Sequence, residues 1–187
     1  TVDEKIFEED DIPQPTTVIR TNLRGIVKDV EGKAIEGALV KIGSESQTTN
    51  LHGYFNFDDI LIIKSGDVLK IEKNGFLSAS KLVIPQFNDN FYHIRMIDGF
   101  TSTSFVSNSG ASVSLNDGAS ITFEANSIVD ENGDQYNGNV LVDGYYLSPT
   151  APFMADLMPG NLSGIKTNDN PTVLATLGMV YANLKNA

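Results

Sequence analysis

The stretch Gly25–Phe57 reads GIVKDVEGKAIEGALVKIGSESQTTNLHGYFNF, and it decides the expected fold. Its short apolar runs alternate with polar residues, and turn-forming residues such as Glu31-Gly32 and Asn50 with Gly53 separate them. Such alternation is typical of strands that cover a core with one face. No sustained helical period occurs between residues 16 and 98. This region therefore predicts an antiparallel β-sandwich of about seven strands.

The order and spacing of these residues resemble those of the carboxypeptidase regulatory-like domain, a transthyretin-like, seven-stranded sandwich of the immunoglobulin-like kind. The matching positions are Gly25, Val27, Asp29, Gly32, Ile35, Gly37, Ala38, Val40, Thr48, Thr49, Asn50, Gly53 and Phe55, followed by Asn74-Gly75-Phe76. Asn50 stands where the family usually has Asp, and either side chain can make the same turn. The resemblance implies a spacing or docking module without catalytic residues, because the zinc site of metallocarboxypeptidases lies in a separate domain.

Residues 99–187 predict a second, smaller β-domain. GASVSLNDGASITFEANSIV (110–129) and GNVLVDGYYLS (138–148) alternate again, and one short helix is expected near residues 152–157. The region is similar to the β-domain that follows such modules in Bacteroidetes surface lipoproteins. The chain stops before the pattern of that group is complete, so we expect this domain to continue beyond it.

The charge of the chain narrows the classes of partner. Residues 1–15, TVDEKIFEEDDIPQP, carry six acids and one lysine, and they predict a solvated leader or tether. The whole chain has a formal net charge of -11, which disfavours nucleic acid and anionic lipid. We therefore expect no nucleic-acid partner, and contact with a membrane only through a lipid anchor upstream of this chain.

The sequence contains no recognisable catalytic or cofactor motif. It has no cysteine, which excludes disulfides, cysteine-zinc sites and thiol catalysis. The two histidines, His52 and His93, are not spaced as zinc ligands, and the sequence has no nucleophile elbow and no phosphate-binding glycine loop. We therefore predict a protein that is not an enzyme and has no cofactor.

The segment DENGDQYNG (130–138) is a calcium-site candidate, with Asp130, Asn132 and Asp134 at alternate positions. An EF-hand loop that begins at Asp130 would need glycine at its sixth position and glutamate at its twelfth. Those positions hold Gln135 and Leu141, so the EF-hand template fails. A looser calcium site remains an alternative, but the Asn-Gly pairs favour a hairpin turn between two strands.

Tyr145 and Phe153 are the residues that we predict for a binding face. Neighbouring residues of a strand point to opposite faces, so at most one ring of Tyr145-Tyr146 is exposed. The principal hypothesis is a non-catalytic, cell-surface structural or interaction module of a bacterial lipoprotein that contacts a protein or a glycan. Its location would be the extracellular side of the envelope, either the outer-membrane surface or the periplasm. The alternatives are a carbohydrate- or peptide-binding adhesin domain and an accessory domain of a metallocarboxypeptidase.

Millimolar calcium is expected to leave the thermal midpoint of unfolding unchanged, because the 130–138 loop lacks the ligands of an EF-hand. Scanning calorimetry in calcium and in a chelator measures this directly. A clear rise in calcium that the Asp130→Ala variant abolishes would contradict the prediction.

Overall fold

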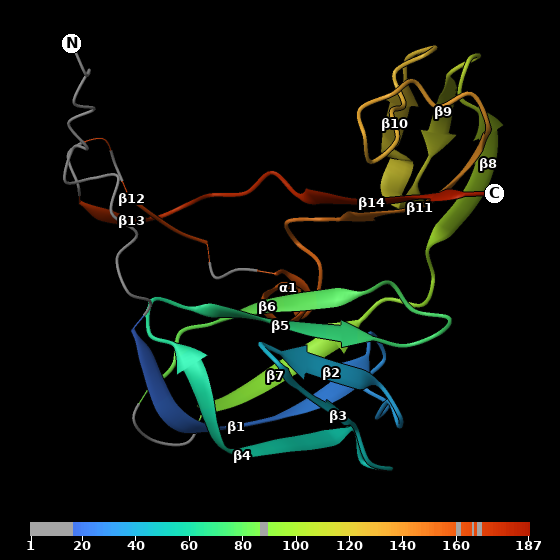
Figure 1. Cartoon of the computed structure of the whole chain (residues 1–187). Coiled ribbons are helices and arrows are strands. Elements are labelled where there is room, and N and C mark those ends of the chain that lie inside the picture. Colours follow the sequence, from blue (N-terminus) through green and yellow to red (C-terminus); the bar gives the residue numbers. More distant parts are fainter. Residues whose placement is uncertain (1–16, 87–89, 160–161, 166, 168–169) are drawn as a thin grey trace, which may run out of the picture.

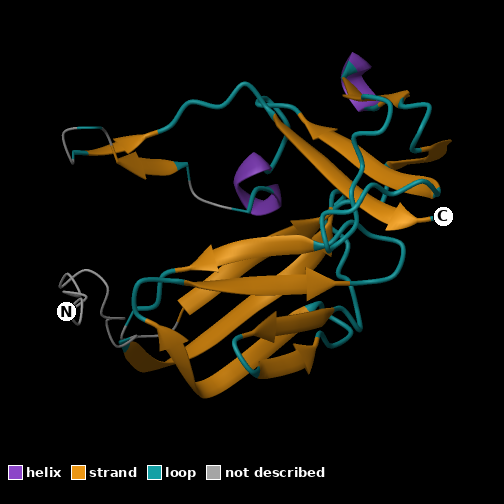
Figure 2. Ribbon diagram, turned by 45° about the horizontal axis from the view of Figure 1, so that its top comes forward, coloured by secondary structure: helices purple, strands orange, loops and turns teal. Residues whose placement is uncertain are grey.

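The structure is a computed structural model that describes residues 17–86, 90–159, 162–165, 167 and 170–187. Strands make up almost all of its regular secondary structure (Figure 1, Figure 2). The all-β fold expected from the sequence is therefore confirmed. The acidic leader predicted at residues 1–15 lies outside the described residues.

The described chain from Val18 to Met96 forms a sandwich of two sheets. The first sheet has the order β4-β1-β7 and consists of β1 (Val18–Asp29), β4 (Tyr54–Ile63) and β7 (Asn90–Met96). The second has the order β3-β2-β5-β6 and consists of β2 (Leu39–Ile42), β3 (Glu45–Thr48), β5 (Asp67–Glu72) and β6 (Ala79–Val83). One hydrophobic cluster takes its side chains from both sheets, so the sheets pack face to face as the predicted seven-stranded sandwich.

Strand β1 shows how the alternating sequence builds this core. Its buried residues alternate with half-buried ones from Thr21 to Asp29, and Leu23 and Val27 are fully buried. Burying one such side chain contributes about 1.5–3 kcal/mol. Gly25 also faces inward, where the ring of Phe55 covers it, and a Cβ at this position would lie 2.6 Å from that ring. The core therefore requires glycine at this position.

The turn before β4 depends on two residues of the opening stretch. Asn50 Oδ1 accepts the backbone N–H groups of His52 at 2.9 Å and Tyr54 at 3.1 Å. Gly53 has a φ of 74°, and its carbonyl accepts the N–H of Val27 at 2.8 Å. A Cβ on Gly53 would lie 2.3 Å from the carbonyl oxygen of Val27, so only glycine allows this close approach.

The hydroxyl of Thr49 connects the segment just before the β4 turn to the loop before β2. Thr49 is buried, and its Oγ1 donates to the carbonyl of Ile35 at 2.6 Å and accepts the N–H of Ala38 at 2.9 Å. The N–H of Ile35 in turn donates to the carbonyl of Val27 at 3.0 Å. The side chain therefore satisfies backbone groups that burial would otherwise leave unpaired.

The expectation of a purely antiparallel sandwich is wrong at one pair of strands. β7 runs parallel to β1, with Leu23 opposite Asn90 and Asp29 opposite Met96. β6 belongs to the other sheet, so the chain crosses between the sheets before it enters β7. A hairpin forces antiparallel neighbours, whereas a crossover allows parallel ones.

The chain after Thr101 forms smaller sheets with a smaller core. One sheet has the order β14-β11-β8 and consists of β8 (Thr101–Val106), β11 (Asn139–Leu147) and β14 (Met179–Asn186). Two two-stranded sheets pair β9 (Ala111–Ser114) with β10 (Ser120–Phe123) and β12 (Ser163–Ile165) with β13 (Pro171–Val173). Phe105 stacks on Phe123 with their ring centroids 5.1 Å apart, so the β9–β10 hairpin packs on one face of the β14-β11-β8 sheet.

The helix expected near residues 152–157 is a single turn, α1 (Met154–Leu157). It begins two residues later than expected. Phe153 caps it in the left-handed region with a φ of 58°.

Substituting Gly53 by Ala is expected to lower the free energy of unfolding far more than substituting Gly75. Both have a positive φ, but a Cβ on Gly75 would meet nothing within 4 Å. Gly75→Ala should cost about 1–2 kcal/mol for the left-handed backbone alone, and Gly53→Ala about 2 kcal/mol more. Urea unfolding measures the free energy of unfolding of both variants. An equal loss in the two variants would contradict the role of the close approach between Gly53 and the carbonyl of Val27.

Candidate functional site

The three candidate calcium ligands, Asp130, Asn132 and Asp134, lie in a loop of residues 128–136. The Asp130 carboxylate holds this loop in shape. Asp130 Oδ1 accepts the backbone N–H groups of Asn132 at 2.9 Å and Asp134 at 3.0 Å. One isolated bridge between Val129 and Gln135 closes the loop. Across the described ranges, no three His, Cys, Asp or Glu side chains gather as a metal site.

The predicted turn is present, since the N–H of Gly133 donates to the carbonyl of Asp130 at 3.0 Å and the closing bridge is antiparallel, but the turn does not join two paired strands as expected. The residues before it make only the single bridge and belong to no strand, and the strand after it, β11, pairs with β8 and β14 instead. The loop thus closes on itself, and its outer side is free to form the wall of a cavity.

This cavity, which we call the loop groove, has a volume of about 600 Å³. The loop forms one wall, and the ends of β11 and β14 form the other. Its lining includes the residues Val129, Glu131, Asn132, Tyr136, Leu184 and Asn186. Within the described structure, the side chains of Glu131, Asn132 and Asn186 have no hydrogen-bond or ion-pair partner. Three polar side chains are therefore available to a ligand.

Lys185 also lines the loop groove, but its charge is balanced inside the protein. Its Nζ lies 2.5 Å from Asp143 Oδ2, and Ser102 Oγ donates to Asp143 Oδ1 at 2.8 Å. The Asp143 side chain is only 7% exposed. The hydrogen bond from Lys185, helped by that from Ser102, holds the pKa of Asp143 below its usual range, although burial acts in the opposite direction.

Tyr145, predicted as a binding residue, lines a different cavity, which we call the apolar pocket. This pocket has a volume of about 300 Å³ and lies between the sandwich and the β14-β11-β8 sheet. Tyr145 and Tyr181 are cross-strand partners and both line it. Most of the remaining lining is apolar, including Leu77, Met96, Leu147, Leu157 and Met179.

Phe153, the second predicted binding residue, lies at the edge of this region beside α1. Its ring is stacked under the guanidinium of Arg95, whose Cζ lies 3.6 Å from the ring centroid. Arg95 therefore covers one face of the ring, although Phe153 is 55% exposed. Of the two predicted residues, only Tyr145 is among the pocket's lining residues.

α1 lies beside the sandwich (Figure 2), and contacts around it join the C-terminal part to the sandwich. Lys81 of β6 donates from Nζ to the carbonyl oxygens of Ala155 and Met158, and Arg95 Nε lies 3.5 Å from Asp156 Oδ2. The N–H of Leu82 donates to the carbonyl of Pro159 at 3.0 Å. Burial lowers the pKa of Lys81, and the charge of Asp156 opposes this shift. We call this set of contacts the α1 fastening.

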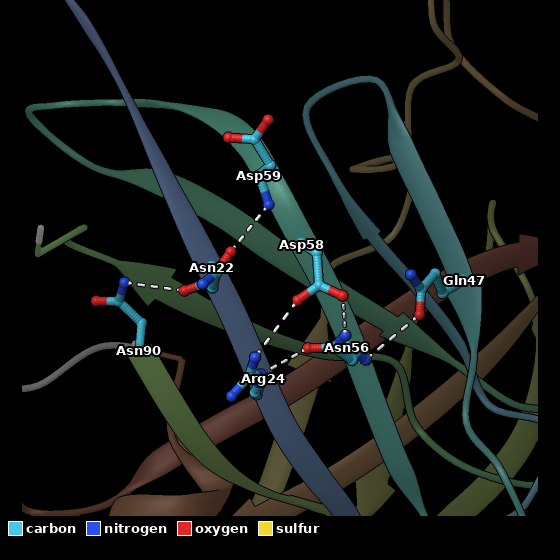
Figure 3. Close-up of polar contacts among 7 residues, drawn as sticks. All are labelled: Asn22, Arg24, Gln47, Asn56, Asp58, Asp59 and Asn90. Atoms are coloured by element: carbon cyan, nitrogen blue, oxygen red, sulfur yellow. Dashed lines mark hydrogen bonds and ion pairs between the residues drawn. The ribbon is translucent and has the colours of Figure 1, made fainter. Parts of the chain in front are cut away.

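A polar network that sequence analysis missed covers the outer face of the first sheet (Figure 3). Arg24 Nε donates to Asn56 Oδ1 at 2.7 Å, and its Nη2 lies 3.4 Å from Asp58 Oδ1. The backbone N–H of Asn56 donates to Gln47 Oε1 at 3.3 Å. The only signal in the sequence is polar residues at alternate positions, which is ordinary for an exposed strand face. These side chains bind one another across β1, β3 and β4.

No family model matches this chain, and no curated protein matches it. A solved structure from Bacteroides uniformis is similar to it, and that protein is named provisionally as a carbohydrate-binding protein. The sequence identity is 10%, the TM-score is 0.36, and the similarity covers 89% of this chain and 79% of that one. At this TM-score the similarity supports no conclusion about the site. In the described part of the chain, no helix has the length and apolarity needed to span a membrane.

Replacing Asp143 by Asn is expected to lower the free energy of unfolding at neutral pH by about 1 kcal/mol. The amide keeps the shape of the carboxylate but loses the charge that Lys185 and Ser102 stabilise. Because folding lowers the pKa of Asp143, its contribution is present above the unfolded pKa and is lost as the pH falls through the folded pKa. The free energies of unfolding of the two proteins, measured in urea, should therefore converge as the pH falls through the folded pKa of Asp143, which lies below the ordinary value of an aspartate.

Glu36→Gln is the matched control, because Glu36 is exposed and makes no ion pair with the described residues. A loss for Asp143→Asn that persists unchanged in acid would show that its charge is not responsible.

Proposed function

We propose that this chain is a non-catalytic binding module of a bacterial cell surface and that it holds a saccharide in the loop groove. One observation carries the proposal, namely that free polar side chains and exposed apolar side chains line the same open cavity. A sugar ring carries hydroxyl groups around its edge and C–H groups on its faces, so it needs both kinds of contact. In ligand sites generally, apolar walls supply contact area, and a few polar groups fix the orientation.

The groups in the loop groove suit both sides of a sugar ring. The amides of Asn132 and Asn186 each donate and accept hydrogen bonds, and the Glu131 carboxylate accepts them from hydroxyl groups. Val129, which is 58% exposed, supplies apolar contact area with Tyr136 on the loop wall, and Leu184, which is 39% exposed, supplies it on the β14 wall. A volume of about 600 Å³ has room for more than one sugar ring. A short oligosaccharide is therefore the ligand that we infer.

The remaining parts of the proposal are supported by the sequence. The sequence contains no nucleophile elbow, phosphate-binding loop or histidine pair with metal-ligand spacing, which supports a role without bond chemistry. The resemblance of the two regions to a regulatory-like domain and to the β-domain of surface lipoproteins supports a location on the extracellular side of the envelope. The acidic leader would act as the tether.

Spacing or docking is the second candidate function, and the α1 fastening favours it. Hydrogen bonds and an ion pair join residues more than 60 positions apart, from Lys81 to Met158 and from Arg95 to Asp156. A module whose two parts are fastened together can hold neighbouring domains at a fixed separation without any ligand.

A glycan array probed with the intact chain tests the proposal, followed by calorimetric titration of the best oligosaccharide. We expect Asn132→Ala and Asn186→Ala each to weaken binding by about five- to tenfold, since each removes a hydrogen-bonding amide. Asn108→Ala is the control, because its amide is exposed but lies outside the loop groove.

Failure of every glycan to bind would leave spacing or docking as the function. Binding that Tyr145→Ala abolishes and Asn132→Ala does not would move the saccharide site to the apolar pocket.

A further inference from the structure

The geometry points to a second ligand site in the apolar pocket, one that takes an aromatic or other apolar group carrying a single acidic group. The pocket shares no lining residue with the loop groove. This inference is therefore independent of the saccharide proposal, and either can fail alone.

The walls of the apolar pocket exclude a saccharide and favour a ring. The tyrosine pair of β11 and β14 faces Leu77 and Met96 of the sandwich across the cavity. Because apolar side chains dominate this lining, most hydroxyl groups of a sugar would lose their hydrogen bonds to water without replacement. A volume of about 300 Å³ has room for a fused pair of aromatic rings with one further ring attached.

The charge at one end of the pocket selects an acidic ligand. Arg95 lines the pocket, and its side chain is only 12% exposed. Its Nε is buried and donates no hydrogen bond within the described structure, because the nearest carboxylate oxygen, on Asp156, is 3.5 Å away. Lys81 adds a second positive charge at α1, where its Nζ donates to the carbonyl oxygens of Ala155 and Met158. Two cations thus face one carboxylate at α1, in a chain whose net charge is -11.

The charge of the Asp156 carboxylate balances only one of these two cations, so the site can bind a second anion. The Nη1 group of Arg95 already donates to the carbonyls of Asp29 at 2.9 Å and Val30 at 3.3 Å, which holds the guanidinium in place. An acidic group at the α1 end of the pocket would complete the pairing of Arg95, while the apolar part of the ligand lies between the tyrosines and Met96. Guanidinium groups are the usual choice for such partly buried carboxylate or sulfonate contacts.

Two dyes with the same ring system test the charge requirement. Anilinonaphthalene sulfonate carries one negative charge, and N-phenylnaphthylamine is its neutral counterpart. We expect calorimetric titration to give one site for the sulfonate, with the neutral dye bound about tenfold more weakly. Equal affinities of the two dyes for the pocket would overturn the inference.

Variants locate the site and test the role of Asp156. Ser78 is exposed at the wall of the pocket, so Ser78→Phe should block entry and reduce binding of both dyes at least tenfold without unfolding the protein. Ser65→Phe, at an exposed position outside the pocket, is the control. Asp156→Asn removes the competing carboxylate and should tighten sulfonate binding about threefold to tenfold, with the neutral dye unchanged.

Thermal unfolding of each variant confirms that it is folded before its titration is interpreted. Unchanged sulfonate binding in a folded Ser78→Phe variant would show that the dye binds elsewhere. Weaker sulfonate binding in Asp156→Asn would show that Asp156 positions Arg95 and does not compete with the ligand. Either result overturns the assignment.

Discussion

The contact between Gly53 and the carbonyl of Val27 is the constraint on which the sandwich depends. It brings the turn before β4 against β1. The carbonyl of Val27 also accepts the N–H of Ile35, a residue of the loop that leads to β2. Thr49 supplies the remaining hydrogen bonds from inside. The turn before β4, strand β1 and the loop before β2 therefore meet at one small group of hydrogen-bonded backbone atoms.

Local chemistry explains which parts of the fold could be predicted. Asn50 and the alternation in β1 act over a few residues, so the sequence contains all the information that they need. The parallel pairing of β7 with β1 was not predictable in this way, because it depends on where a crossover ends. Pairing of that kind is decided by the packing of the two sheets as a whole.

The same distinction separates the candidate sites. Strand alternation predicts that one ring of Tyr145-Tyr146 faces each side, and Tyr145, the residue predicted for a binding face, lines the apolar pocket. The loop groove was missed because its free amides, Asn132 and Asn186, come from segments that only the finished sheet brings together. Arg95 was missed as well, since nothing around it in the chain indicates Phe153 or Asp156 as neighbours.

The parallel pairing of β1 and β7 has a mechanical consequence. The sandwich begins with β1 and ends with β7, and parallel neighbours place the start of one and the end of the other at opposite ends of the sheet. Tension applied through the two ends would pull these strands past each other in shear, so their hydrogen bonds would bear the load together instead of opening one at a time. A sandwich held through these two ends would therefore resist extension.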